Sequence, residues 1–310
     1  MRWGVCTTVR ATPEQVLAFA AHHLALGAEH VWVHLDDPGD PAAEALDGLK
    51  GVTAIRCDDA HWARMGRRPE KHQRRQVRNL ARICRRSDLD FIGHFDVDEF
   101  LTAARPVSGI LAEVPPDRIM LRAEPYEALH SPGLADDIFT ARHFRRGLHR
   151  NDPAALQRLH GPHAGLLPKG MMSHTVGKCL FRTRLEGIEP GIHGARRGQE
   201  RIDGGPFHPD LALLHFHAED PARWRAGLEF RLTKGAYQYI PALQAFLTAA
   251  GPGEIDAFYH RVQTATPETL ATLSGLGLLL TADLGLRAKV AALSRRRADS
   301  PLPPPHIRAF

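Results

Sequence analysis

The chain has 310 residues, enough for one large domain or two smaller ones with a substantial buried core. Its 43% hydrophobic residues never form an uninterrupted apolar run of about 18 residues, so the sequence predicts no transmembrane helix. With 40 basic and 35 acidic residues, the net charge of +5 is a weak preference for anionic partners such as nucleotide phosphates.

The cysteines and the N-terminal segment bear on the cellular compartment. Cys6, Cys57, Cys84 and Cys179 lie far apart without a zinc-binding spacing, which favours buried free thiols in a reducing compartment. The N-terminus lacks the apolar stretch of a signal peptide. We therefore expect a cytoplasmic protein, with a peripheral contact to the inner face of the membrane through basic residues as a further expectation.

The first hundred residues alternate between apolar runs typical of strands and periodic patterns typical of helices. The strand expected at 3–9 precedes a helix that Thr12 caps, Pro13 begins and Gly27 ends. Further strands are expected at 30–35, 52–57 and 91–95, with helices at 42–49 and 70–86. This order predicts an α/β fold in which helices cover both faces of a mostly parallel sheet.

Acidic residues follow two of these strands. Asp36 and Asp37 end the strand at 30–35, and Asp96 ends the strand at 91–95. Because ligands of open α/β sheets bind outside the carboxyl ends of the strands, we expect all three carboxylates around one crevice.

The most informative segment, 91–101, carries an apolar run into three carboxylates, Asp96, Asp98 and Glu99. Side-chain alternation along a strand would place Asp96 and Asp98 on the same side. Two such carboxylates repel each other unless a proton or a cation lies between them, and Mg²⁺ binds one or two carboxylates together with substrate phosphates. The segment therefore predicts a divalent metal that links the protein to a diphosphate. A helix cap or a solvated turn is the plainer alternative.

The helix expected at 70–86 has a basic face and an apolar face. Val77, Leu80, Ala81 and Cys84 form the apolar face, which should pack on the sheet. The residues nearest the crevice, from 73 to 78, are predicted to neutralise an anionic substrate, and a solvated charged face is the alternative. The basic residues that recur every three or four positions are Lys71, Arg75, Arg78, Arg82 and Arg85.

Beyond residue 105 the alternation decays. Strands are expected at 119–122, 175–182 and 211–217, mobile loops at 161–170 and 190–209, and helices at 221–239, 254–262, 267–274 and 281–297. We predict a domain over 1–220, with halves at 1–104 and 105–220, then a helical extension over 221–298. The proline-rich tail at 299–310 is expected to be disordered.

The segment at 91–101 resembles the "DvDEFL" signature of bacterial glycosyltransferase family 2-like proteins of GT-A fold. Similar likenesses to that family occur at 8–10, 22–28, 31–37, 73–80, 177–182, 191–194 and 214–224, and the resemblance covers roughly residues 3 to 235. It implies a GT-A-type, Rossmann-like, mostly parallel sheet flanked by helices, with a helical C-terminal segment. The family's usual "KNE" is replaced by Val9-Arg10-Ala11, so that acidic contact is missing unless Glu14 takes its place.

The resemblance implies a metal-dependent glycosyltransferase, with Mn²⁺ or Mg²⁺ and a UDP- or GDP-sugar as donor. Asp98 would coordinate the metal, Asp96 would bind the ribose or the metal through water, and Glu99 would shape the site. His215 is the expected third metal ligand, with His217 and His193 as alternatives. The nucleotide-binding residues expected from the resemblance and from the crevice are Val9, Arg10, Asp36, Asp37, Gln73, Arg78 and Lys178.

A transfer with inversion, the usual outcome in that family, also needs a carboxylate base near the acceptor hydroxyl. Glu124 and Asp203 are the two candidates. The hydroxyl-bearing acceptor could be a growing polysaccharide, a lipid-linked sugar or a protein, and the sequence leaves these alternatives open.

Two other functional classes fit parts of the sequence. A haloacid-dehalogenase-like phosphatase also uses Asp-x-Asp at a strand end, although there the motif normally lies near the start of the chain. A non-catalytic basic module could bind nucleic acid through 71–86, since basic surfaces bind phosphates. No specific nucleic acid is expected, because the chain shows no aromatic stacking platform and the acidic segment would repel a phosphate backbone.

Overall fold

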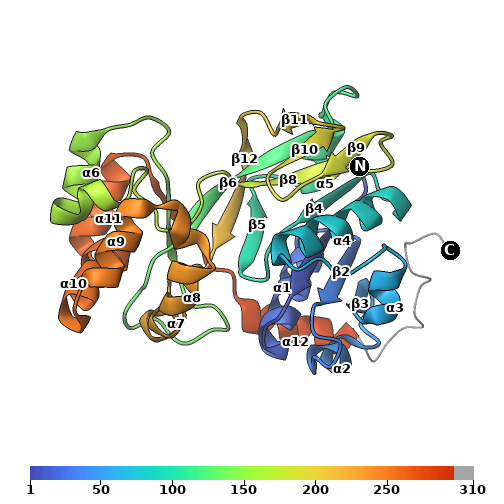
Figure 1. Ribbon diagram of the computed structural model, residues 1–310, viewed down its shortest axis with the longest axis horizontal. Helices are drawn as coiled ribbons and strands as arrows, with labels where there is room; N and C mark the ends of the chain where they lie inside the picture. Colours follow the sequence, from blue (N-terminus) through green and yellow to red (C-terminus); the bar gives the residue numbers. More distant parts are fainter. Residues whose placement is uncertain (297–310) are drawn as a thin grey trace. The chain divides into compact units, whose positions relative to one another are not determined.

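The structure is a computed structural model that describes residues 1–296 (Figure 1). Its contacts divide the chain into two compact units, described here separately. Unit 1 comprises 1–124, 177–213 and the described residues from 285, and unit 2 comprises 125–176 and 214–284. Each unit is therefore assembled from separate stretches of chain, and the predicted domain boundary at 220 stays a prediction. The predicted tail at 299–310 lies outside the described residues.

Unit 1 is built on a mixed sheet, so the chain is an α/β protein. Four strands, in the order β4-β1-β2-β3, are parallel, as the alternation in the first hundred residues predicts. Their bounds are Phe91–His94 for β4, Trp3–Val9 for β1, His30–Leu35 for β2 and Val52–Arg56 for β3. Antiparallel strands then extend the sheet beyond β4: β8 (Lys178–Arg182) and the first part of β6 (Met120–Ala128). The sheet is thus mixed rather than parallel throughout.

One face of this sheet packs against helices through alternate strand residues. Val5 and Val31 point to the same apolar cluster as Phe19 of α1 and Leu293 of α12. In Figure 1, α12 lies beside α1 although the two are far apart in the chain. Thr12 caps α1 as expected. The helices on this face are α1 (Pro13–Ala25), α2 (Ala42–Leu46), α5 (Val107–Ala112) and α12 (Leu286–Arg296).

The opposite face carries the intervening strand residues. Cys6, Trp32 and Ile92 form an apolar cluster with Leu80 and Ile83 of α4 (His72–Arg86). A small antiparallel sheet of β9 (Ile188–Pro190), β10 (Gly194–Arg197) and β11 (Glu200–Asp203) adds to this cluster. The prediction of a mobile loop at 190–209 is therefore wrong. The hairpin between β10 and β11 turns through Gly198, whose φ of +58° suits glycine.

Two further strands and a short helix complete unit 1. Strand β5 (Glu99–Ala103) pairs with β12 (Phe207–His215), and α3 (Asp59–Ala63) precedes α4. Strands β6 and β12 each continue from unit 1 into unit 2 along the chain. All four cysteines are buried and free, which confirms the sequence prediction.

Unit 2 is largely helical. Its strands are the second part of β6 with β7 (His143–Arg146) and β13 (Leu279–Thr281). Trp224, Tyr237, Leu243 and Phe258 are buried in one apolar core. The helices are α6 (Pro153–His160), α7 (Pro221–Ala226), α8 (Leu228–Thr233), α9 (Pro241–Ala249), α10 (Pro252–Gln263) and α11 (Pro267–Gly275), with 3₁₀ helices at Gly161–Leu166 and Ala236–Tyr239.

Three predictions for the second half of the chain are wrong. The loop expected at 161–170 contains a 3₁₀ helix, and the single helix expected at 221–239 is three short helices interrupted at Gly227 and Gly235. The helix expected from residue 281 begins only at Leu286, because Thr281 ends β13 and Gly285 has a positive φ of 53°. Within the described residues, no helix combines the length and the hydropathy needed to span a bilayer.

Candidate active site at the carboxyl ends of the parallel strands

The acidic segment forms a turn between two strands. Strand β4 ends at His94 and β5 begins at Glu99, whose N–H donates to the carbonyl of Asp96 at 2.9 Å. The Asp96 N–H in turn donates to the Glu99 carboxylate at 2.8 Å. The prediction that strand alternation places Asp96 and Asp98 on the same side is therefore wrong. Strand β4 ends at His94, and these two hydrogen bonds hold the residues that follow it in a turn.

Lys178 is the cation that holds the acidic turn together. Its ammonium lies 2.7 Å from an oxygen of Asp96 and 2.7 Å from an oxygen of Glu99. Lys178 and Glu99 are fully buried, at 1% and 0% side-chain exposure. The side-chain amide of Gln76 donates to the other oxygen of Asp96. The paired carboxylates are therefore Asp96 and Glu99, and a protein ammonium rather than a metal ion separates them.

The ionisation of this cluster follows from that geometry. Burial lowers the pKa of Lys178, but attraction by Asp96 and Glu99 outweighs it and raises the pKa above its usual value. Burial raises the pKa of Asp96, but the Lys178 charge outweighs it and the pKa falls below its usual value. Asp98, half-buried in the same turn, is the third carboxylate. Two carboxylates, those of Asp96 and Glu99, therefore contact one ammonium, so this contact has an excess of negative charge.

The carboxylate at the end of β2 has the opposite surroundings. The Arg75 guanidinium binds both oxygens of Asp36, at 2.7 and 2.8 Å, and Arg68 lies 3.2 Å away. Burial raises the pKa of Asp36, but hydrogen bonds from His72, Arg75 and Arg68 outweigh it and hold the pKa far below its usual range. Two guanidiniums face one carboxylate here, so positive charge is in excess. The neighbouring Asp37 is exposed and accepts from the Gly39 N–H at 2.9 Å.

Helix α4 connects these two strand ends. Arg75 reaches Asp36, and the next residue, Gln76, reaches Asp96. The sequence analysis named Gln73, which is exposed, and Arg78, which donates to the carbonyls of Met65 and Arg67. It missed Gln76. A signal for Gln76 existed: a helical stripe of buried residues at i, i+3, i+4, i+7 and i+8 begins with it and continues through Asn79, Leu80, Ile83 and Cys84.

A buried imidazole lies next to the turn. His94, the last residue of β4, is 1% exposed, and its ring nitrogens have no hydrogen-bond partner within the part of the chain that the structure describes. Burial, and then the nearby Lys178 charge, lowers the pKa of His94 to about 4. The imidazole is therefore neutral at ordinary pH, and it adds no cation to the Asp96 cluster.

The remaining residues of unit 1 that were predicted to bind the nucleotide or act as the catalytic base differ in burial and contacts. Val9 ends β1, and its carbonyl accepts from the Asp36 N–H at 3.0 Å, whereas Arg10 is exposed. Glu124 is half-buried in β6. Asp203 is exposed at the end of β11, 3.6 Å from Arg122. The nucleotide contacts and the role of catalytic base stay predictions for these residues.

Ligand types suited to a metal ion occur in each unit. Unit 1 offers the buried carboxylate of Glu99, and unit 2 offers the imidazoles of His174 and His215. The ring nitrogens of these two histidines lie within 4.8 Å of each other, so they can share one ion. The sequence analysis named His215 but not His174, which lies in an irregular segment without a recognisable motif.

The two alternative histidines make hydrogen bonds of their own. The Nε2 atom of His217 lies 3.1 Å from the Tyr237 hydroxyl, inside unit 2. The Nδ1 atom of His193 lies 2.6 Å from the Gly177 carbonyl, inside unit 1. The assignment of Asp96, Asp98 and His215 to one metal ion stays a prediction.

The comparisons with known proteins add little to this description. No family model matches the sequence, and no curated protein matches it. Among solved structures, the chain is similar to residues 1–349 of S. aureus TarS, at 12% sequence identity and a TM-score of 0.31. The match covers 96% of this chain and 90% of that one. So distant a similarity assigns no function to this chain.

Proposed function

We propose that this chain is a metal-dependent glycosyltransferase. It would transfer a sugar from a nucleotide-sugar donor, a UDP- or GDP-sugar, to a hydroxyl-bearing acceptor. The observation that carries the proposal is the pair of strand ends joined by α4. The turn at 96–99 has an excess of negative charge, and the surroundings of Asp36 have an excess of positive charge. A cation with its diphosphate needs both kinds of neighbour.

The residues of the turn fit a hard divalent cation at Asp98. Both oxygens of Asp96 already accept hydrogen bonds, from Gln76 and Lys178, so Asp96 is better suited to a water-mediated contact. Asp98 offers carboxylate oxygens in a half-buried turn, which is the donor type that Mn²⁺ and Mg²⁺ prefer. When bound, such an ion stabilises the negative charge that develops on a departing diphosphate.

The other residues of the site would bind and orient the reactants. Arg68 and Arg75, which hold Asp36, would offset the phosphate charge. Lys178 fixes the acidic turn by binding two of its carboxylates. In the transfer, an acceptor oxygen bonds to the anomeric carbon as the bond to the diphosphate breaks. The hydroxyl proton passes to a carboxylate, for which Glu124 and Asp203 are the candidates.

The direct test is metal-dependent stabilisation by nucleoside diphosphates. Thermal unfolding is measured with UDP, GDP and related diphosphates, each with and without Mn²⁺. At least one diphosphate should raise the melting temperature when Mn²⁺ is present, because a ligand that binds only the folded state stabilises it. Asp98→Asn should abolish the shift, whereas Asp117→Asn, at an exposed position outside the site, should leave it unchanged.

The result that would overturn the proposal is a panel in which no diphosphate stabilises the protein with Mn²⁺. A metal-dependent shift that survives Asp98→Asn would leave the transferase proposal standing but place the ion elsewhere. Phosphate release from para-nitrophenyl phosphate, lost in Asp96→Asn, would instead indicate the phosphatase alternative.

A further inference from the structure

The outer side of α4 borders a groove lined with arginines, separate from the strand-end site. The groove has a volume of about 730 Å³, and one carboxylate, that of Glu189, is among its lining residues. Binding sites for small molecules and polymer segments are commonly of this size. Its arginines are Arg64, Arg74, Arg78, Arg82, Arg85, Arg86 and Arg196.

These arginines come from three segments of unit 1. Arg74, Arg78, Arg82 and Arg85 recur every three or four residues, so they follow one side of α4. From Arg74 to Arg86 this side extends about 18 Å along the helix axis. Arg64 follows α3, and Arg196 lies on β10, so arginines from other elements also line the hollow. The groove is thus elongated and basic along its length.

Like charges in this groove act on one another. Burial, and then the charges of Arg86, Arg64 and Arg85, lowers the pKa of Arg82. An anion bound among these groups would reduce their mutual repulsion, and guanidiniums bind phosphate through paired N–H donors. The groove is therefore electrostatically suited to a ligand that carries several negative charges.

We propose that this groove binds a linear polymer of phosphate groups. A chain of charges matches the arginines spaced along α4 better than a single phosphate does. The lining residues include no aromatic side chain, so the groove offers contacts to phosphates and no platform for stacked bases. This binding is a property of the chain beyond the proposed sugar transfer.

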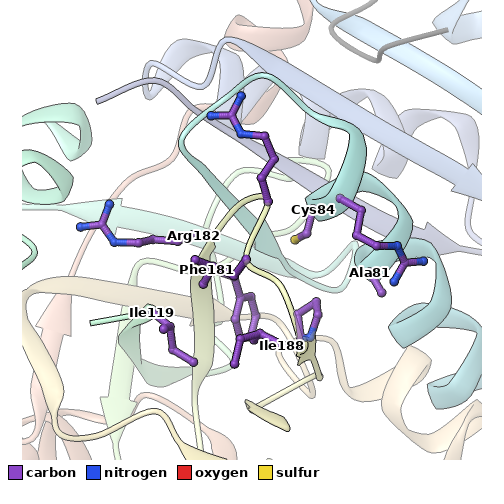
Figure 2. A pocket seen from close by; sticks show the side chains of 10 residues that line it. Ala81, Cys84, Ile119, Phe181, Arg182 and Ile188 are labelled. Carbon is purple, nitrogen blue, oxygen red and sulfur yellow. The ribbon is translucent and has the colours of Figure 1, made fainter. Parts of the chain in front are cut away.

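A neighbouring hollow argues against insertion of a lipid chain. Arg85 lines both spaces, but the second has a volume of only about 10 Å³, enough for about one water molecule. Figure 2 shows Ile119, Phe181 and Ile188 among the side chains that line it, with Ala81 and Cys84 coming from α4. This apolar hollow is therefore too small to hold an acyl chain. A polymer in the concave groove fits the observations better than a membrane surface does.

The experiment measures binding of inorganic polyphosphate of about twenty units over a range of salt concentrations. The unmodified protein should bind with an affinity that falls steeply as salt rises. The triple variant Arg74→Ala, Arg85→Ala, Arg196→Ala removes three exposed guanidiniums. It should bind at least tenfold more weakly, and its logarithmic salt slope should be smaller by about three, about one for each arginine.

Matched controls separate the groove from net charge. Arg287→Ala removes one exposed arginine that does not line the groove and should leave binding nearly unchanged, whereas Arg85→Ala alone should weaken it. Arg85→Lys should retain part of the affinity because the charge remains. Thermal unfolding of each variant checks that it is folded.

Three results would overturn the proposal. The first is polyphosphate binding that the triple variant does not weaken. The second is retention by phosphatidylglycerol vesicles without polyphosphate binding, which would indicate a membrane surface instead. The third is single-stranded RNA bound much more tightly than polyphosphate of equal charge, which would indicate base recognition. Asp98→Asn should leave polyphosphate binding intact, so this test can fail or succeed independently of the nucleotide test.

Discussion

At the end of β2, two guanidiniums hold the single carboxylate of Asp36, whereas at the end of β4 one ammonium holds the two carboxylates of Asp96 and Glu99. Both strands flank β1, and α4 reaches each end with consecutive side chains. The difference is in the sign of the charge left over. One strand end is left with positive charge and the other with negative charge, and under the proposed function this combination would suit a metal-bound diphosphate.

The charged side chains at the two strand ends also differ in their exposure to solvent. Lys178 and Glu99 are almost completely buried. At the other strand end Arg75 and Asp36 are largely buried, and Arg68 is half exposed. Removing one member of a buried ion pair leaves a charge that water cannot solvate, and removing an exposed one leaves a charge that water solvates readily. Four predictions test the comparison on this basis.

The largest effect is expected for Lys178→Met. The variant leaves Asp96 and Glu99 without their shared cation, so the free energy of unfolding should fall by about 3–5 kcal/mol. Urea denaturation at pH 7 measures the loss, and Lys50→Met, at an exposed position, should change it by less than about 0.5 kcal/mol. Adding Asp96→Asn and Glu99→Gln should recover part of the stability. A loss below about 1 kcal/mol would show that Lys178 is not needed to hold the turn.

A smaller effect is expected at the other strand end. Arg75→Ala removes a two-point contact with Asp36 but leaves Arg68 in place, so the loss should be about 1.5–3 kcal/mol. The pKa of Asp36 should rise toward its ordinary value. The same denaturation experiment with Arg74→Ala, the exposed neighbour on α4, provides the control. Equal losses in the two variants would contradict the assignment of Arg75 to Asp36.

The buried histidines make stability depend on pH. Burial lowers the pKa of His23 and His94 to about 4 and that of His34 and His160 to about 3, against an ordinary value of 6.5. The unfolded chain therefore binds more protons below pH 6.5. The stabilising effect of these neutral imidazoles is fully present above that pH and is lost as the pH falls toward 4. Each histidine contributes about 1.4 kcal/mol per pH unit in this window.

Replacing one such imidazole should change that slope. In His94→Phe, the decline of the unfolding free energy between pH 6.5 and 4.5 should be less steep by about 1.4 kcal/mol per pH unit. His149→Phe, at an exposed position, should retain the original slope. Denaturation curves at several pH values give both slopes, and identical slopes would mean that His94 is protonated in the folded state. The carboxylates Asp36 and Asp96, whose pKa is lowered, cost stability only below about pH 4.

The smallest effect is expected for the ion pair between Arg287 of α12 and Glu14 of α1. The two charges are 2.7 Å apart, but both side chains are about half exposed, so the coupling should be at most about 1 kcal/mol. A double-mutant cycle of Arg287→Ala and Glu14→Ala measures it. A coupling above about 2 kcal/mol would show that this contact, rather than apolar packing of Leu293, attaches α12 to unit 1.

Local patterns were sufficient for the first hundred residues and failed later. In the first hundred residues, apolar runs and capping residues alternate regularly, and β1, β2 and β4 begin and end within one residue of their predicted bounds. Helix α1 begins at Pro13 as predicted and ends two residues before Gly27. Between 190 and 209 the strands are short, and their apolar residues are too few for a periodic signal. The interruptions of the helix expected at 221–239 depend on Gly227 and Gly235, which a periodicity argument passes over.

By itself, the sequence determined the alternation of strands and helices and, through it, the places of Asp36 and Asp96 directly after two strands. Only the tertiary structure decided which cation meets the acidic turn. Lys178 follows Asp96 by 82 positions, and it reaches the turn because β8 runs antiparallel beside β4, with Leu180 opposite Gly93. Helix and strand periods are set by near neighbours in the chain, whereas an ion pair between distant residues depends on how strands are ordered across the sheet.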